Sequence, residues 1–187
     1  MTGPDARSIG AAVAGDPADG ALRTRLRPVR PAERGLLDHW GRHPCSPYDD
    51  WSGPPAPGVL STALLRPPPG GDELVVTDGT DTPIGTVSWM PVLYAPTPGS
   101  QAYDLGISLQ AAARGQGHGT RAQQMLARLL FATTGVHRLQ ASTDVTNVAE
   151  QRALERAGFL REGVLRGAQW RQGAWHDLVA YGRLRDD

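Results

Sequence analysis

The spacing of apolar and polar residues predicts that an edge strand and a helix open the ordered part of the chain. Residues 22–29 alternate apolar positions with arginines, which is typical of a strand with one exposed face. A helix is expected over residues 31–43, because proline suits a first helical turn and Leu36, Leu37 and Trp40 recur on one face. The ordered chain therefore begins as a strand followed by a helix.

A loop region and a hairpin are expected next. Prolines and glycines are dense over residues 44–71, which leaves room only for a short helix at about residues 58–65. Residues 73–77 and 83–93 are apolar runs that flank the turn sequence DGTD at residues 78–81. This pattern predicts an antiparallel pair of strands.

A strand, a glycine-rich loop and a helix then follow in immediate succession. Residues 102–109 alternate, so that apolar side chains share one face and Asp104, Gly106 and Ser108 share the other. The loop sequence RGQGHG occupies residues 114–119. The helix after it has one apolar stripe at helical spacing, formed by Ala122, Met125, Leu126, Leu129 and Leu130.

A second strand and helix repeat this order. Residues 138–143 are expected to form the strand and residues 147–157 the helix. Asn147 and Glu150 have the spacing of a capping box at the start of the helix, and Gly158 suits the left-handed position at its end.

A hairpin closes the chain. Its strands are expected over residues 159–166 and 175–184, with the turn at Gln172 and Gly173. The order of all the elements predicts an α/β fold with a mixed sheet and helices packed on it.

Composition narrows the possible chemistry. The chain has 187 residues and a formal net charge of zero, and all 19 of its basic residues are arginine. The absence of lysine excludes pyridoxal Schiff bases, lysine aldolases, protein-kinase catalysis and the Walker phosphate loop. The charge balance argues against nucleic-acid binding, which needs a basic face. Cys45 is the only cysteine, so no internal disulfide can form, and we expect a cytoplasmic protein.

The N-terminal residues differ in composition from the rest. Residues 1–21 are rich in Ala, Gly, Asp and Pro, which predicts a disordered extension. They lack the basic start of a signal peptide, and no apolar run is long enough to cross a membrane. The expected domain therefore covers residues 22–187.

The glycine-rich loop is the candidate binding site. Its glycines let the backbone approach a ligand, and the helix that follows presents unpaired N–H groups at the positive end of its dipole. An anion is expected there, such as a pyrophosphate, with Arg114 supplying a guanidinium. Two other interpretations stay open: a dinucleotide-binding loop, with Asp144 as the ribose-binding acid but Thr120 in place of the last glycine, and a turn that binds nothing.

Several motifs in order carry a family resemblance. Arg114, Gly117 and Gly119 match the [QR]xxGx[GA] signature of the GNAT superfamily of acetyl-CoA-dependent N-acetyltransferases, between a strand and a long helix. The downstream residues look like the branch that acetylates ribosomal-protein N-termini and its relatives. The residues that match are Asn147, Ala157, Gly158, Phe159, Glu162, Gly163, Leu165, Arg166, Trp170, Gly173, Trp175, Asp177 and Tyr181.

The resemblance implies a fold and a cofactor site. The expected fold is a single α/β domain with a mixed, mostly antiparallel sheet, a splayed central pair of strands and flanking helices. In such enzymes the loop amides hold the pyrophosphate of coenzyme A, and the strand before the loop pairs with its pantetheine arm. The resemblance assigns acetyl-CoA binding to Ile107, Ser108, Leu109, Arg114, Gly115, Gln116, Gly117, His118, Gly119, Thr120 and Asn147.

The resemblance also implies direct transfer of the acetyl group to an amine, which needs a neutral amine, donors for an oxyanion and a proton for the leaving thiolate. Asp104 stands where the family often has an acidic residue, and we expect it to accept the amine proton or to bind the ammonium group. A structural carboxylate is the other interpretation of Asp104. No general acid is assigned, because Glu150 replaces the serine of many relatives and a capping box accounts for it.

The acceptor is expected to be a primary amine: a protein N-terminus, an amino acid or a small molecule. Four aromatic residues are candidates for binding it, although most such residues are core residues: Trp89, Trp170, Trp175 and Tyr181. We expect no metal, no nucleic-acid or membrane partner, and a monomer or homodimer. The alternative function is a non-catalytic module that binds acyl-CoA as a sensor.

Overall fold

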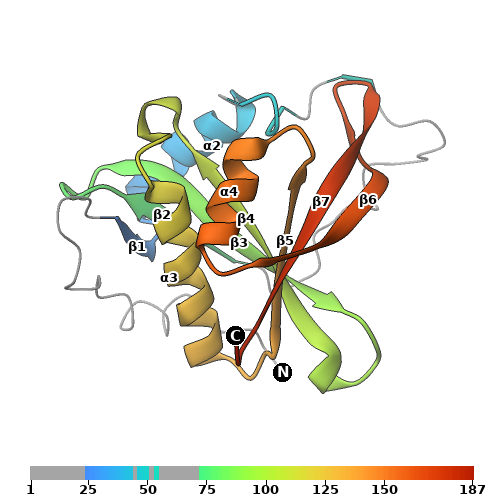
Figure 1. The fold of residues 1–187 in the computed structure, drawn as a ribbon. Helices are drawn as coiled ribbons and strands as arrows, with labels where there is room; N and C mark the ends of the chain where they lie inside the picture. The colour runs from blue at the N-terminus through green and yellow to red at the C-terminus, as the bar shows by residue number, and fades with distance from the viewer. Residues whose placement is uncertain (1–23, 44–45, 51–52, 55–71) are drawn as a thin grey trace.

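The computed structural model describes residues 24–43, 46–50, 53–54 and 72–187 of the chain. The expected N-terminal extension and the helix expected at about residues 58–65 lie outside the described residues. The described residues form one seven-stranded sheet with the strand order β1-β2-β3-β4-β5-β7-β6 (Figure 1). The strands are β1 (Arg25–Pro28), β2 (Asp72–Thr77), β3 (Pro83–Leu93), β4 (Gln101–Leu109), β5 (Arg138–Asp144), β6 (Leu160–Arg171) and β7 (Ala174–Leu184).

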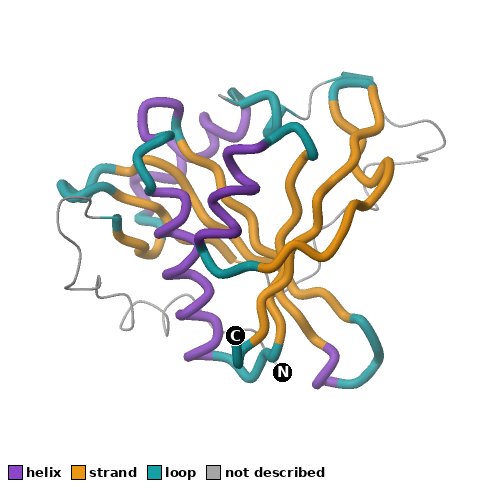
Figure 2. The backbone as a smooth tube through the Cα atoms, viewed as in Figure 1, coloured by secondary structure: helices purple, strands orange, loops and turns teal. Residues whose placement is uncertain are grey.

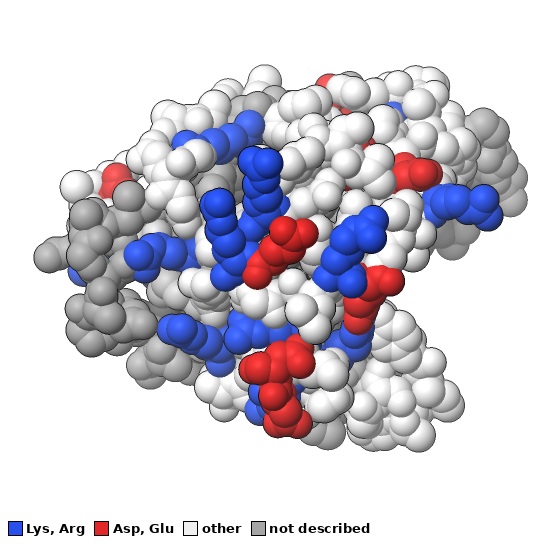
Figure 3. All heavy atoms as spheres, in the orientation of Figure 1, with Lys and Arg blue, Asp and Glu red and all other residues white. Residues whose placement is uncertain are grey.

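The helices in the described part are α2 (Arg34–Arg42), α3 (His118–Thr133) and α4 (Val148–Arg156), with three short 3-10 turns, η1 (Pro31–Glu33), η3 (Pro98–Ser100) and η4 (Ala111–Ala113). Figure 1 shows α3 and α4 side by side on one face of the sheet. That face carries arginine and acidic side chains interspersed, in keeping with the zero net charge (Figure 3). The expected α/β fold with a mixed, mostly antiparallel sheet is confirmed.

The core lies between α3 and the sheet, as the apolar stripe predicted. Leu126 and Leu130 of α3 are fully buried, and Tyr103 and Leu105 of β4 point toward the same cluster. Burying a leucine side chain contributes about 1.5–3 kcal/mol, so this stripe fixes α3 against β4. The helix that follows the glycine-rich loop is therefore held rigidly beside the strand that precedes the loop.

The central strands β4 and β5 are the one parallel pair among the described strands, and they separate along their length. Their pairing runs from Ala102 opposite Arg138 to Leu105 opposite Ala141. Beyond Leu105, β4 continues to Leu109 beside β3, while β5 continues beside β7. Figure 2 shows the two halves of the sheet diverging from this short pairing. The expected splayed pair is confirmed, and it opens a gap in the middle of the sheet.

The chain reversals follow the local sequence. In the turn between β6 and β7, Gln172 and Gly173 have φ values of 51° and 79°, the left-handed pair that a two-residue hairpin needs. Gly158, expected at the end of α4, has a φ of 87°. The hairpin strands extend further toward the turn than the sequence predicted, to Arg171 and from Ala174.

Two expectations about helices need correction. The apolar face expected on α2 is not a buried face, since α2 has no buried residue and Leu36 is 41% exposed. At α4, the Asn147 side chain accepts a hydrogen bond from Glu150 N at 3.3 Å. Asn147 N, however, donates to the carbonyl of Asp144 at 2.9 Å, so the Glu150 carboxylate does not complete the expected capping box.

The close approach of β3 to the end of β4 gives a test of this architecture. A Cβ atom on Gly85 would lie 2.2 Å from the carbonyl oxygen of Ser108 and 3.0 Å from Leu109 Cα. We expect Gly85→Ala to push the end of β4 away and to lower the free energy of unfolding by about 1–3 kcal/mol. Urea denaturation measures the loss. Gly135→Ala is the matched control, since nothing lies within 4 Å of its added Cβ, and a similar loss in both variants would contradict the close contact.

Candidate functional site

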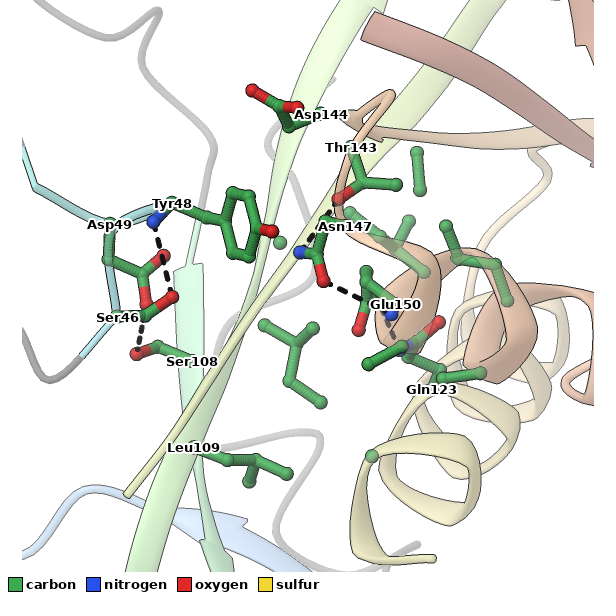
Figure 4. Close-up of a pocket in the computed structure, with 18 of the residues that line it drawn as sticks. Ser46, Tyr48, Asp49, Ser108, Leu109, Gln123, Thr143, Asp144, Asn147 and Glu150 are labelled. Carbon is green, nitrogen blue, oxygen red and sulfur yellow. Dashed lines mark hydrogen bonds between the residues drawn. The ribbon is translucent and has the colours of Figure 1, made fainter. Parts of the chain in front are cut away.

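A cleft of about 690 Å³ opens where β4 and β5 separate. Residues of β4, the glycine-rich loop, α3, β5 and α4 line it, and so do residues 46–49. Figure 4 shows Tyr48, Asp49 and Ser108 on one side of the cleft and Gln123 and Glu150 on the other. The cleft between β4 and β5 is thus bordered by the loop that the sequence singled out.

The loop is shaped by its own glycines and side chains. Gly115 and Gly117 have φ values of 71° and 87°, which residues with a side chain rarely adopt. Gly117 is the N-cap of α3 and provides no side-chain cap, so the first amides of the helix keep their N–H groups unpaired by the helix. Arg114 donates to the Leu109 carbonyl through Nε at 2.9 Å and Nη2 at 2.7 Å. The loop therefore presents backbone donors at the positive end of a long helix, which suits an anion.

Residues 46–50, which we call the strap, close the cleft on the side opposite the helices. The Ser108 hydroxyl donates to Asp49 Oδ2 at 3.2 Å, which ties the strap to β4. The Tyr48 hydroxyl donates to the carbonyl of Thr146 at 3.2 Å, which ties it to the turn between β5 and α4. The strap therefore bridges the two diverging halves of the sheet.

Asp104 lies on the polar face of β4 and lines the cleft. Burial raises the pKa of Asp104, while a hydrogen bond from the Gln140 side chain opposes the shift. The Gln140 oxygen in turn accepts a hydrogen bond from the Tyr94 hydroxyl. The carboxylate is thus positioned by a neutral network, and it is free of an arginine or histidine partner within the described residues.

Glu150 lines the cleft from the first turn of α4. Its carboxylate accepts a hydrogen bond from Gln123 Nε2 at 2.8 Å. Burial raises the pKa of Glu150 to about 7; the Gln123 hydrogen bond opposes the shift, and the negative charge of Asp49 adds to it. The cleft therefore holds a carboxyl group that exchanges a proton near neutral pH.

A buried ion pair closes one end of the cleft. Arg171 Nη2 lies 2.5 Å from Asp144 Oδ2, and the two side chains are 4% and 2% exposed. Burial would raise the pKa of Asp144, but hydrogen bonds from Thr146 and the Arg171 guanidinium lower it to about 2. Asp144 is thus bound to arginine and holds the β6–β7 hairpin against the end of β5.

Most of the residues assigned to acetyl-CoA binding come together in this cleft. Its lining contains Asp104 and nine of the eleven positions assigned to acetyl-CoA: Ile107, Ser108, Leu109, Arg114, Gly115, Gly117, Gly119, Thr120 and Asn147. The exceptions are Gln116, whose side chain donates to the Ala112 carbonyl at 2.6 Å, and His118. The His118 ring is 6% exposed and lies 2.9 Å from the Thr24 hydroxyl, so it faces β1 rather than a ligand.

The aromatic candidates for acceptor binding need correction. Trp89 and Tyr181 are 1% and 0% exposed and belong to the core, so no bound amine can stack on them. Trp170 and Trp175 form an edge-to-face pair, 5.1 Å between ring centroids, near the tip of the β6–β7 hairpin. Trp170 Nε1 donates to the Pro54 carbonyl at 2.8 Å, and neither tryptophan lines the cleft.

Among the cleft residues that did not emerge from the sequence as site residues are Tyr48, Asp49, Gln123 and Arg171. Tyr48 and Asp49 lie in the proline-rich region, where no periodicity indicates which side chains face inward. Gln123 is a polar residue next to the apolar stripe of α3, and it is only 2% exposed. For Gln123, the only signal in the sequence was a glutamine placed next to the apolar stripe of a helix.

The described part of the chain shows no group of three or more His, Cys, Asp or Glu side chains placed to hold a metal ion. Among the described helices, none has the length and apolar character that a membrane crossing requires.

Sequence comparison relates this chain to known proteins. The family model for the acetyltransferase (GNAT) domain matches residues 23–160. The Bacillus subtilis (strain 168) protein named "Probable N-acetyltransferase YjcK" is 31% identical over 113 residues. That alignment covers 60% of this chain and 61% of the relative, so the chain spans less than two thirds of that protein.

Structural comparison finds the same fold in solved structures. Ribosomal-protein-S5-alanine acetyltransferase from Vibrio fischeri has a TM-score of 0.67 and 22% identity, covering 92% of this chain and 98% of that one. RimJ of Mycobacterium smegmatis, solved in complex with CoA-disulfide, has a TM-score of 0.69 and 20% identity, covering 93% of this chain and 87% of that one.

The raised pKa of Glu150 predicts a pH-dependent stability. The folded protein binds the proton with a pKa of about 7, against the ordinary value of 4.5. The contribution of Glu150 to stability is therefore fully present below its ordinary pKa and is lost as the pH rises through about 7. Glu150→Gln removes this dependence. Urea denaturation measures the free energy of unfolding of both proteins. The difference between variant and wild type should change by about 3 kcal/mol in favour of the variant from acidic to alkaline pH. A difference that stays constant with pH would contradict the burial of a neutral carboxyl group.

Proposed function

The chain belongs to the acetyltransferase (GNAT) family, and we propose that it transfers the acetyl group of acetyl-CoA directly to a primary amine. The observation that carries this proposal is the cleft between β4 and β5, with the glycine-rich loop at its border. The proposed reaction needs acetyl-CoA and an amine, and no metal, nucleic acid or membrane takes part in it. We place it in the cytoplasm, with a monomer or homodimer as the active unit.

The cleft suits the two ends of coenzyme A. Beyond Leu105 the edge of β4 that faces β5 pairs with no strand among the described residues, so the backbone of residues 106–108 is available to the amide groups of a pantetheine arm. Gly115, Gly117 and the first amides of α3 supply donors for a pyrophosphate. Arg114 lies beside them as the cation that a chain without lysine can offer. These groups would bind the donor and place its thioester in the gap.

Asp104 is the proposed group that binds the acceptor ammonium or accepts the proton of the amine. It lines the cleft on the face of β4 away from α3, next to the point where the strands part. Its raised pKa suits a base, because a carboxylate with little affinity for protons removes one from an amine less readily. An amine entering from this side meets Asp104 before it meets the helices.

The charged residues that line the cleft restrict the class of acceptor. Asp49 and Asp104 line the cleft on the side of the strap and β4, and Arg171 is neutralised by Asp144. The other arginines of the lining lie on the glycine-rich loop and on α4. A protonated amine is attracted to the acidic side, and a protein N-terminus, an amino acid and a small amine all present one. One structural relative is named for acetylating a ribosomal-protein alanine, which makes peptide N-termini the first acceptors to test.

Mass spectrometry on a panel of acceptors tests the function. Purified protein, acetyl-CoA and each of several peptides, amino acids and amines should yield at least one product heavier by one acetyl group, with release of one free thiol. Stabilisation by coenzyme A without turnover on any acceptor would favour the alternative, a non-catalytic acyl-CoA sensor. Stabilisation by NAD instead of coenzyme A would indicate the dinucleotide-binding interpretation of the loop.

Asp104→Asn tests the proposed base. The variant keeps the size of the side chain but cannot accept the proton, so we expect kcat to fall by about 10²-fold or more while the Kd for coenzyme A is unchanged. In the wild type, activity should also fall as the pH drops through the raised pKa of Asp104, and the variant should lose this limb of the profile. Asp186→Asn removes an exposed carboxylate far along the chain and serves as the control. Wild-type kcat in Asp104→Asn would assign this carboxylate a structural role only.

A further inference from the structure

The position of Glu150 in the cleft has no structural explanation in helix capping. Its backbone N–H is capped by Asn147, but its carboxylate does not return to Asn147 N, which is bonded to Asp144 instead. The carboxylate turns toward α3 and lines the cleft. A partly buried carboxyl group that does not cap a helix costs stability, so another contribution is needed to account for it.

The surroundings of Glu150 favour its neutral form. Gln123 Nε2 is the one hydrogen-bond partner of the Glu150 carboxyl group within the described residues, and it is uncharged. The side-chain oxygen of Gln123, Oε1, is buried and has no hydrogen-bond partner among the described residues. Gln123 is 2% exposed and lines the same cleft. An unsatisfied buried acceptor of this kind points to a missing donor, either a protonated carboxyl or an N–H of a bound ligand.

Asp49 faces this pair from the strap. It accepts a hydrogen bond from Ser108, and although burial raises its pKa, that bond and the charges of Arg114 and Arg171 oppose the shift. Asp49 and Glu150 act on each other electrostatically, because the charge of Asp49 raises the pKa of Glu150. The cleft thus holds two carboxyl groups whose pKa values are both raised by burial, and only that of Asp49 is held back by cations as well as by a hydrogen bond.

The other described charged and titratable groups around the two carboxyl groups form no ion pair with Glu150. The Tyr181 hydroxyl lies on β7 and donates a hydrogen bond to Glu155 at 3.2 Å. The negative charge of Glu150 contributes to the raised pKa of Tyr181. From α4, the side chains of Arg152 and Arg156 also line the cleft. No arginine or histidine forms an ion pair with Glu150 among the residues that the structure describes.

We infer that Glu150 is the general acid that protonates the departing coenzyme A thiolate, and that Asp49 opposite it binds the ammonium form of the acceptor. This inference rests on the proposed acetyl transfer. The neutral amine nitrogen attacks the thioester carbonyl carbon, a C–N bond forms, and the C–S bond breaks. Before the attack, the bound ammonium loses one proton to Asp104, which passes it to solvent. As the C–S bond breaks, the sulfur takes the proton of the Glu150 carboxyl, and the nitrogen loses its second proton to Asp104, which again releases it to solvent. The products are the amide and the free thiol, and solvent then returns the proton to Glu150.

The proton affinity of Glu150 suits this step. A thiol has an ordinary pKa of about 8.5, and an acid with a pKa of about 7 can protonate a thiolate while still holding its own proton near neutral pH. The acid works only in its protonated form, so kcat should fall as the pH rises through about 7. Asp49 raises that pKa, so its removal should move the fall to lower pH.

The experiment compares four variants on the acceptor that the wild type acetylates best. We expect Glu150→Gln to lower kcat by about 10²- to 10⁴-fold, to leave the Kd for coenzyme A unchanged and to abolish the alkaline fall in kcat. Asp49→Asn should raise the KM for the amine and shift the alkaline fall to lower pH. The double variant should show no alkaline fall. Glu155→Gln, on the same helix but outside the cleft lining, is the matched control and should keep the wild-type kcat and profile.

Two outcomes separate this inference from the proposed function. If the wild type acetylates an amine and Glu150→Gln does so at the same kcat with the same alkaline fall, the inference is wrong and the proposed function stands. If the wild type releases no thiol from acetyl-CoA with any amine, the proposed function is wrong and the inference is overturned with it. Circular dichroism on each variant shows whether a loss of kcat is a loss of fold, and the shift in Asp49→Asn tests the role of Glu150 in a protein that keeps Glu150.

Discussion

The short pairing between β4 and β5 is the constraint on which the rest of the site depends. Hydrogen bonding stops after Leu105 opposite Ala141, and from there each strand follows its own antiparallel neighbour. A sheet that separates in this way exposes backbone groups that a continuous sheet would pair, and buried backbone groups must find partners. The gap is therefore a cleft bordered by backbone of β4 that pairs with no strand on that side among the described residues, which suits the arm of a ligand with amide groups.

Two devices keep the separated halves in place. On one face α3 and α4 pack together, with the apolar stripe of α3 fixed on β4. On the other face the strap connects Ser108 to the turn at Thr146, and Arg171 reaches Asp144 from the hairpin. Breaking a buried ion pair of this kind by removing one partner costs about 3–5 kcal/mol, because the other charge stays buried. The opening of the sheet is thus held by contacts on both of its faces.

The acidic groups of the cleft show a conflict between stability and chemistry. Asp104, Asp49 and Glu150 all have raised pKa values, and burial is the main cause for each. A folded protein with no further use for these carboxyls would be more stable with neutral side chains of the same shape. Carboxyl groups with raised pKa values around a cleft are typical of functional sites, which supports the proposed role of these residues in proton transfer.

The sequence predicted the frame of this site well. Alternation along β4, the glycines of the loop and the stripe of α3 are local patterns, and each depends on the period of one element. Periodicity did not reveal which aromatic residues are buried: Trp89 and Tyr181 belong to the core because of what packs on their strands. The spacing of Asn147 and Glu150 also led to a wrong prediction for the Glu150 carboxylate. A capping-box spacing permits the reciprocal hydrogen bonds, but only the bond from Glu150 N to Asn147 forms.

The sequence by itself determined the order of the elements, the place of a glycine-rich loop between a strand and a long helix, and the exclusion of every lysine-dependent chemistry, because these follow from residue types and short spacings. Only the tertiary structure decided which side chains face one another across the cleft. Asp49 and Ser108 are separated by 59 residues, and Gln123 and Glu150 by 27, so the contacts that set their proton affinities exist only after the sheet has formed and the helices have packed on it. Proton affinity depends on burial and on neighbouring charge, and neither is a property of a sequence segment.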